Sequence, residues 1–207
     1  MSLRKGTVAG LTARVFRISF SGELAFEINV SADDGVALWE ALLEVGAKYD
    51  ITPYGTETMH VLRAEKGYVI VGQDTDGSVT PADLGMDWIV SKAKDFVGKR
   101  SLVRSDMLKE NRKQLVGLVT EQPGTILPEG TQLVNEPSTD YPVPMTGHVT
   151  SSYYSANLGH SIALALVKGG HGRIGATVYA PTLDRQLIKA TITSPVFYDA
   201  ENVLHKT

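Results

Sequence analysis

The sequence predicts an α+β fold in its first half and a small antiparallel β domain in its second half. Up to about Lys109, segments with strand-like alternation are mixed with segments that carry apolar residues at helical spacing. After the charged stretch "KENRK" at 109–113, the pattern changes to short β runs separated by turn-forming residues. We therefore expect two domains, residues 1–109 and residues 110–207, because 207 residues can supply a core to each of them.

The first predicted elements are a β-hairpin and a helix. Residues 13–20 and 24–30 alternate apolar with polar side chains on either side of a short loop that contains Gly22. Ser31, which is followed by two aspartates, is typical of a helix N-terminus. The helical spacing that follows predicts an inward-facing apolar stripe formed by Val36, Trp39, Leu42 and Leu43.

A second helix is predicted from about Thr56 to Lys66, with Gly67 as its C-terminal stop. The apolar run "YVIV" at 68–71 then predicts a strand, and a last short helix is expected around residues 99–108. A hairpin, helices and a strand together indicate an α+β unit.

The second half is predicted to consist of short strands. Turn-rich segments such as "LPEG" and "KGGHGRIG" separate the runs, as expected for a small barrel or a sandwich. The predicted strands are residues 115–120, 132–135, 147–151, 161–167, 176–180 and 186–193.

Composition excludes several classes of function. The chain has 20 basic and 23 acidic side chains and a net charge of −3, so it lacks the positive field that nucleic acid requires. It has no cysteine, which excludes disulfides, thiolate metal sites and cysteine nucleophiles. The longest apolar run, Ile162–Val167, is far too short to span a membrane, and no secretory signal opens the chain. We expect a cytoplasmic protein.

Two segments resemble ligand-binding motifs but do not meet their requirements. "GHGRIG" at 170–175 has the spacing of a dinucleotide-binding motif, yet a predicted strand follows it instead of the helix that would receive the pyrophosphate. The acidic loop at 71–85 resembles an EF-hand loop only in Asp74 and Asp76, since its first position is Gly72 and its twelfth is Asp83. The five histidines have no metal-ligand spacing, so no metal site is predicted.

Glu27 has two possible roles. By alternation it lies opposite the predicted buried face of its strand, where a solvated glutamate is the ordinary interpretation. A carboxylate in a pocket could instead accept paired hydrogen bonds from a planar N–H group of a ligand. Periodicity does not distinguish between the two.

Several segments together resemble one family. "RISFSGELAFEI" at 17–28 is similar to the strand–turn–strand motif of the glycine cleavage T-protein, or aminomethyltransferase, family. "LRAEKGYVIVGQDTDGSVTPADLGMDWIV" and "DFVGKRSL" resemble its next two signatures, and "GHVTSSYYSANLGHSIALALV" with "SPVFYD" resembles its C-terminal barrel. The resemblance implies part of a ferredoxin-like folate-binding domain followed by a small antiparallel β-barrel, with the acidic loop shaping the folate domain.

The resemblance also implies a set of folate contacts. The pterin-binding glutamate of the family falls on Glu27, and its pterin-contacting tyrosine falls on Phe20, which keeps the ring but lacks the hydroxyl. The arginine that contacts the folate falls on Met59, so the folate tail must be held differently or by Arg63, one helical turn further on. The catalytic aspartate of the family lies upstream of this sequence, and no catalytic residue is assigned here.

Within the family, residues 53–81 look most like the alpha subunits of heterotetrameric sarcosine oxidases. This implies the C-terminal portion of such a subunit, supporting oxidative demethylation of sarcosine to glycine with one-carbon transfer to tetrahydrofolate, giving 5,10-methylenetetrahydrofolate. FAD, FMN and NAD would bind other domains or subunits, and the partners would be the remaining alpha-subunit domains and the other subunits. The isolated region would be inactive. The alternatives are a non-catalytic folate-binding or subunit-docking module and a T-protein-like aminomethyltransferase.

Overall fold

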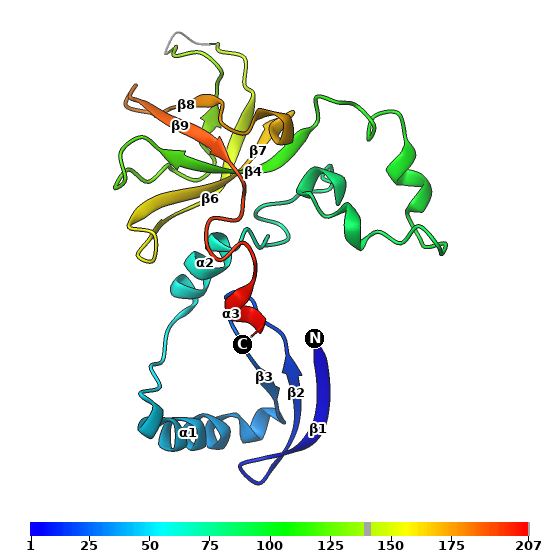
Figure 1. Ribbon diagram of the computed structural model, residues 1–207, viewed down its shortest axis with the longest axis vertical. Helices are drawn as coiled ribbons and strands as arrows, with labels where there is room; N and C mark the ends of the chain where they lie inside the picture. Colours follow the sequence, from blue (N-terminus) through cyan, green and yellow to red (C-terminus); the bar gives the residue numbers. More distant parts are fainter. Residues whose placement is uncertain (139–141, 207) are drawn as a thin grey trace. The chain divides into compact units, whose positions relative to one another are not determined.

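The computed structural model describes residues 1–138 and 142–206. Its contacts divide the chain into two compact units (Figure 1). One unit contains Met1–Arg63 together with the C-terminal residues from Asp199 onward, and the other contains Ala64–Tyr198. Each unit has an antiparallel sheet of its own, which confirms the predicted α+β class.

The first unit contains a three-stranded antiparallel sheet in the order β1-β2-β3. Its strands are β1 (Ser2–Val8), β2 (Leu11–Arg17) and β3 (Glu27–Asn29). The pairing of the predicted hairpin is confirmed, because Phe16 pairs with Glu27 and Arg14 with Asn29. Its predicted short loop is wrong, since residues 18–26 all lie between the two strands. The sequence did not predict β1, since its side chains are mostly polar and nearly all exposed. This strand is held in place by its backbone pairing with β2.

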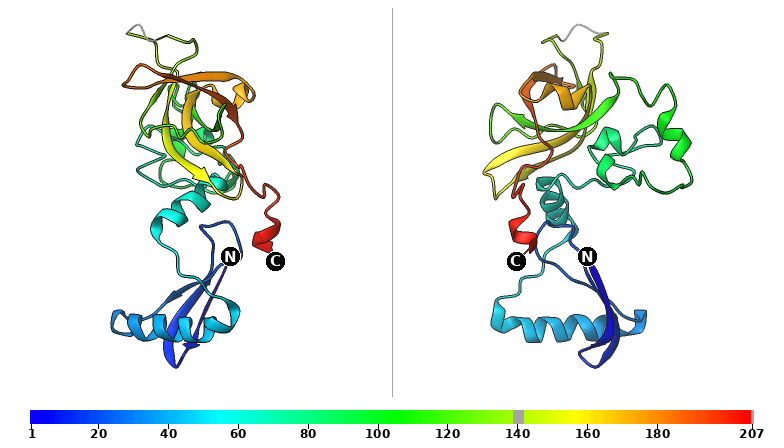
Figure 2. Two further views of the ribbon diagram at one scale, coloured as in Figure 1. Left: turned by 90° about the vertical axis from the view of Figure 1, so that its left-hand side faces the viewer. Right: turned by 45° about the vertical axis from the view of Figure 1, so that its right-hand side comes forward.

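Helix α1 (Gly35–Gly46) lies next to this sheet (Figures 1 and 2). The predicted inward stripe is wrong: Leu38 is the large apolar residue that α1 buries, whereas Val36 and Trp39 are 70% and 55% exposed. The unit therefore leaves an apolar side of α1 in contact with solvent. Ser31 makes no side-chain capping hydrogen bond to the short 3₁₀ helix at Ala32–Asp34 that precedes α1.

The C-terminal residues of the chain return to this first unit. After the barrel, α3 (Val203–Lys206) belongs to the same compact unit as the N-terminal sheet. The Leu24 N–H donates to the Leu204 carbonyl (3.1 Å), and the Arg17 guanidinium donates to the His205 carbonyl (3.4 Å). The first unit is thus assembled from both ends of the sequence.

Helix α2 (Thr56–Glu65) is confirmed, and Gly67 follows it with a φ of +67°. A Cβ at Gly67 would come within 2.6 Å of the Pro195 carbonyl oxygen, so this position requires glycine for both conformation and space. The predicted strand at 68–71 is wrong, because the Ile70 N–H donates to the Asp74 carboxylate (2.8 Å) and forms no sheet pairing. The expected helix at 99–108 is only a 3₁₀ helix, Lys99–Val103.

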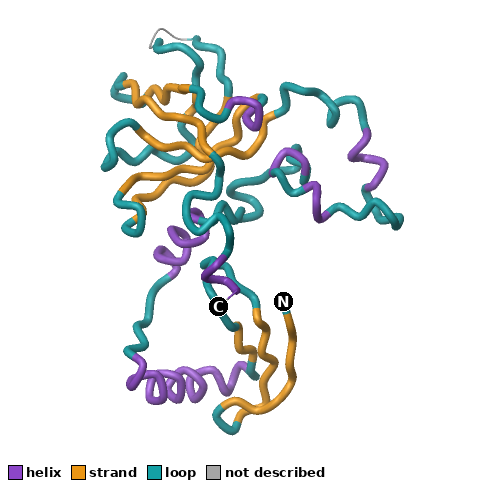
Figure 3. The backbone as a smooth tube through the Cα atoms, viewed as in Figure 1, coloured by secondary structure: helices purple, strands orange, loops and turns teal. Residues whose placement is uncertain are grey.

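The second unit contains a six-stranded antiparallel sheet that closes into a barrel (Figure 3). The strand order is β5-β6-β7-β4-β9-β8. Val134, just after β5, exchanges two 2.9 Å backbone hydrogen bonds with Tyr179 of β8, and this pair joins the two ends of the sheet. The strands are β4 (Lys113–Thr120), β5 (Gln132–Leu133), β6 (Gly147–Ser155), β7 (His160–Lys168), β8 (Thr177–Pro181) and β9 (Leu187–Thr193).

Two layers of apolar residues surround the central strands of the barrel. The inner layer includes Val116, Leu118 and Ala165, all fully buried. The outer layer contains Leu115, Leu164 and Leu166, which are covered by residues from outside the barrel: Val69, Val79, Leu84 and Phe197. Because three of these four partners come from residues 64–85, that segment packs in the same unit as the barrel. A domain boundary at 109/110 stays a prediction.

The "GHGRIG" segment is a turn. It contains a short 3₁₀ helix, Gly170–Arg173, and leads into strand β8, with no α-helix at which a pyrophosphate could bind. The interpretation of this segment as a turn is confirmed.

Candidate functional site

Glu27 lies on one face of the N-terminal sheet. It pairs across the strands with Phe16, which in turn pairs with Leu3, so these three residues form one row. Glu27 is exposed, and its Oε1 accepts a hydrogen bond from the Asn29 amide at 3.0 Å. An accessible carboxylate beside apolar side chains can accept hydrogen bonds from a flat ligand that lies across this face.

Phe20 lies in the loop between β2 and β3, and the residue is 37% exposed. The Ser19 hydroxyl accepts a hydrogen bond from the Gly22 N–H (2.9 Å), and Gly22 has a φ of +92°, so the loop turns sharply just after Phe20. The structure therefore places an accessible ring and an accessible carboxylate on one short strand–loop–strand segment.

Arg63 differs from these two residues, since its side chain has no exposed surface at all. It lies near the end of α2, where Met59 precedes it by one turn and is partly buried. A fully buried guanidinium does not present a cation at the surface of this chain. The role of Arg63 in holding a folate tail stays a prediction.

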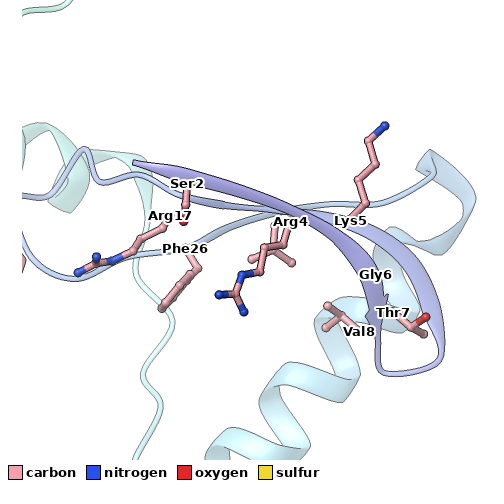
Figure 4. A pocket seen from close by; sticks show the side chains of 9 residues that line it. Ser2, Arg4, Lys5, Gly6, Thr7, Val8, Arg17 and Phe26 are labelled. Carbon is pink, nitrogen blue, oxygen red and sulfur yellow. The ribbon is translucent and has the colours of Figure 1, made fainter.

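A groove of about 560 Å³ runs beside β1 (Figure 4). Figure 4 shows Arg4, Val8 and Phe26 on one side of the β1 ribbon and Lys5 on the other. Val15 also lines the groove, and it precedes Phe16 in β2, so this part of the groove lies on the sheet face opposite Glu27. Sequence reasoning missed the groove because it did not predict β1. The concentration of basic residues between 4 and 17 is the signal that could have indicated it.

The acidic loop at 71–85 forms a buried network with the barrel. Asp74 is fully buried, and its Oδ1 accepts hydrogen bonds from the hydroxyls of Thr150 (2.6 Å) and Ser151 (2.7 Å). The register of β6 shifts between Val149 and Ser151, which marks a β-bulge that aims both hydroxyls at one oxygen. Over residues 1–138 and 142–206, no group of three or more His, Asp or Glu side chains could hold a metal ion.

Asp83 of the same loop forms an ion pair with Arg112. The Arg112 Nη2–Asp83 Oδ2 distance is 2.6 Å, and Thr80 donates to the same oxygen from its N–H and its hydroxyl, both at 2.8 Å. Burial raises the pKa of Asp83, but the hydrogen bonds from Arg112 and Thr80 outweigh it, so the pKa lies below the ordinary value of 3.8. The carboxylate therefore connects the acidic loop to the start of the barrel.

This pKa predicts an acid-sensitive contribution to stability. A carboxyl whose pKa is lower in the folded state stabilises the fold above its unfolded pKa, and the contribution is lost as pH falls through the folded pKa. We expect the free energy of unfolding, measured with urea, to fall between about pH 5 and pH 2. The fall should be smaller in Asp83→Asn. At neutral pH, the free energy of unfolding of Asp83→Asn should be lower than that of wild type by about 1–2 kcal/mol. Asp95→Asn, whose side chain is fully exposed, is the control. Parallel pH profiles for wild type and Asp83→Asn would contradict the assignment.

Two family models match the chain in order. Residues 1–94 match the GCVT N-terminal domain, and residues 113–199 match the glycine cleavage T-protein C-terminal barrel domain. The chain belongs to the glycine cleavage T-protein family. Among the described residues, no helix is both long and apolar enough to cross a membrane.

Relatives within this family include two kinds of enzyme. The chain is 51% identical over 93% of its length to the sarcosine oxidase subunit alpha of Corynebacterium sp. (strain P-1), and 43% identical over 91% to that of Rhizobium meliloti (strain 1021). It is 32% identical over 95% of its length to the aminomethyltransferase of Thermotoga petrophila. The chain spans about a fifth of the sarcosine oxidase subunits and about half of the aminomethyltransferase.

The T-protein fold is also found by structural comparison. The crystal structure of the glycine cleavage system aminomethyltransferase T from Bartonella henselae aligns with a TM-score of 0.77 at 23% identity. The alignment covers 91% of this chain and 50% of that one. The predicted small antiparallel barrel is thereby confirmed as the C-terminal barrel of the T-protein family.

Proposed function

We propose that this chain is the tetrahydrofolate-binding C-terminal portion of a sarcosine oxidase alpha subunit. The observation that carries the proposal is the exposure of both Glu27 and Phe20 on one strand–loop–strand segment, at the two positions where the family resemblance implies pterin contacts. The 51% identity to a sarcosine oxidase subunit, against 32% to an aminomethyltransferase, favours the oxidase over a free-standing transferase.

The side chains present fit a pterin. A reduced pterin has neighbouring N–H groups along one edge, and a carboxylate such as Glu27 is the group that accepts such donors most strongly. An exposed aromatic ring such as Phe20 can pack against its flat face. For the tail of the folate, Met59 supplies no charge, and Arg63 stays the proposed cation although it is buried in this structure.

The proposed role in the reaction is positioning. Tetrahydrofolate, when bound, supplies the amine that captures the one-carbon unit removed from sarcosine, giving 5,10-methylenetetrahydrofolate and glycine. Glu27 would fix the pterin edge and Phe20 its plane, so that the amine is held in a single orientation. Alignment of this kind can replace several kcal/mol of entropic barrier. Oxidation of sarcosine is assigned to flavin in other domains or subunits, and no catalytic residue is proposed in this chain.

Calorimetric titration of tetrahydrofolate into the complete subunit tests this proposal, with Phe20 as the reporter. Phe20→Ala should weaken binding about 2- to 12-fold, equivalent to about 0.5–1.5 kcal/mol for a lost ring contact. Phe20→Tyr should bind at least as tightly as wild type, because the ring is kept and a hydroxyl is added. Absence of folate binding by the wild-type subunit would leave the chain as a subunit-docking module. Equal affinity of wild type and Phe20→Ala would remove Phe20 from the site.

A further inference from the structure

Two cations share the sheet face that carries Glu27. Residues that pair across strands point to the same face, and every second residue along a strand returns to it. Lys5 pairs with Arg14 and Arg14 with Asn29, and this row lies next to the row that contains Glu27. The hydrogen bond from the Asn29 amide to Glu27, at 3.0 Å, connects the two rows. Figure 4 shows Lys5 on the opposite side of β1 from Arg4.

Neither of these two cations is neutralised within residues 1–138 and 142–206. Lys5 and Arg14 are both exposed, and neither side chain forms a hydrogen bond or an ion pair with the residues that the structure describes. Glu27 is the only acidic residue of β1, β2 and β3, and its hydrogen bond is with Asn29. Like charges directly opposite each other on neighbouring strands destabilise a sheet. An anion bound between Lys5 and Arg14 would relieve this repulsion.

The order of charges across this face matches the order of polar groups along a folate. Glu27 accepts hydrogen bonds on β3, and the two cations follow on β2 and β1. A folate has N–H donors along the edge of its pterin at one end and the two carboxylates of its glutamate at the other. A ligand bound with its pterin edge at Glu27 can therefore direct its carboxylates toward Arg14 and Lys5.

The dimensions of the sheet allow this arrangement. Neighbouring strands lie about 4.8 Å apart and alternate residues about 6.7 Å apart, so roughly 12 Å separates the backbones of Glu27 and Lys5 across the face. An extended folate is longer than this separation. The long side chains of Lys5 and Arg14 can follow its carboxylates away from the sheet.

The tail of the folate has no accessible cation at the positions that the family resemblance implies. Met59 is uncharged, and Arg63 has no exposed surface. We propose that Lys5 and Arg14 bind the glutamate carboxylates of tetrahydrofolate. The planar guanidinium of Arg14 can pair with one carboxylate through two hydrogen bonds, and the Lys5 ammonium can attract the other as a point charge. This inference rests on the proposed function and names the residues that hold the tail.

Removing charge from the ligand and from the protein separately tests the proposal. The probes are tetrahydrofolate and its diamide, in which both glutamate carboxylates are carboxamides and the pterin is unchanged. In calorimetric titrations of the complete subunit, wild type should bind the diamide about 4- to 25-fold more weakly, because each accessible ion pair contributes about 2- to 5-fold. Lys5→Gln/Arg14→Gln should lose the same factor for tetrahydrofolate and should not distinguish it from the diamide.

Arg4→Gln is the matched control, because Arg4 is an exposed cation on the opposite side of β1 (Figure 4). It should bind tetrahydrofolate with wild-type affinity. Urea unfolding distinguishes a ligand contact from a structural role: removal of two opposed like charges should leave the double variant at least as stable as wild type. Lower stability together with weaker binding of both probes would overturn the proposal, because the pair would then stabilise the fold.

Three further results would overturn it. Equal affinity of the wild-type subunit for tetrahydrofolate and the diamide would mean that no cation holds the tail, and the proposed folate function would stand. A double variant that prefers tetrahydrofolate as strongly as wild type does would assign the tail to another cation, such as Arg63. Failure of wild type to bind either probe would remove the proposed function, and this inference with it.

Discussion

Replacing Asp74 by alanine is expected to lower the free energy of unfolding of the barrel unit by about 3–5 kcal/mol. The hydroxyls of Thr150 and Ser151 and the Ile70 N–H all donate to this fully buried carboxylate. Alanine would leave them inside the protein without that acceptor, and each unsatisfied buried donor costs about 1–3 kcal/mol. Urea denaturation followed by tryptophan fluorescence and circular dichroism measures the loss.

Asp76→Ala is the matched control, because this second aspartate of the same loop is exposed. Its carboxylate accepts hydrogen bonds from the N–H and hydroxyl of Ser78 only two residues away. The expected loss is below about 1 kcal/mol, as for most surface positions. If Asp74→Ala and Asp76→Ala destabilise the protein to the same small extent, the network between loop and barrel is not a main contributor to stability.

The second large effect is expected at Glu27 in the complete subunit. Glu27→Gln keeps the size of the side chain but replaces one acceptor oxygen with an amide that donates. The lost charge-assisted hydrogen bond is worth about 1.5–3 kcal/mol, so tetrahydrofolate affinity should fall about 10- to 150-fold. Reduction of flavin by sarcosine should barely change, since that reaction is assigned to another site.

Glu23→Gln provides the control for this experiment. Glu23 is an exposed glutamate of the same strand–loop–strand segment, and it does not lie at the position that the family resemblance implies for pterin contact. Its replacement should leave folate affinity unchanged. Equal folate binding by wild type and Glu27→Gln would return Glu27 to the role of a solvated strand residue. A fall in both activities with a lower melting temperature would mean that Glu27 stabilises the hairpin instead.

The barrel was predictable because its signals are local. Each of its strands carries a short apolar run bounded by turn-forming residues, and the strands were found within a few residues of their true ends. The sequence did not distinguish a barrel from a sandwich. Among the described residues, closure depends on the pair Val134–Tyr179, whose two members lie 45 positions apart in the chain. Periodicity carries no information about such a distant pairing.

The errors in the first half have a common cause. β1 was missed because its side chains do not alternate, and the strand at 68–71 was wrong because Asp74 competes for the backbone of Ile70. The apolar stripe through Trp39 was assigned to a core, but Trp39 is 55% exposed and Leu38 is the buried residue of this helix. For the proposed site, Glu27 and Phe20 are assigned only through the family resemblance, and the sequence gives no sign that Arg63 is buried.

The return of the C-terminal residues to the first unit has a consequence for biosynthesis. Because the carbonyls of Leu204 and His205 accept hydrogen bonds from Leu24 and Arg17, these contacts of the N-terminal segment can form only after residues 64–198 have been synthesised. Translation of the intervening Ala64–Tyr198 takes roughly 7–27 s at about 5–20 residues per second. The barrel can form before the N-terminal hairpin has made its hydrogen bonds to α3. During that interval the hairpin is accessible to chaperones.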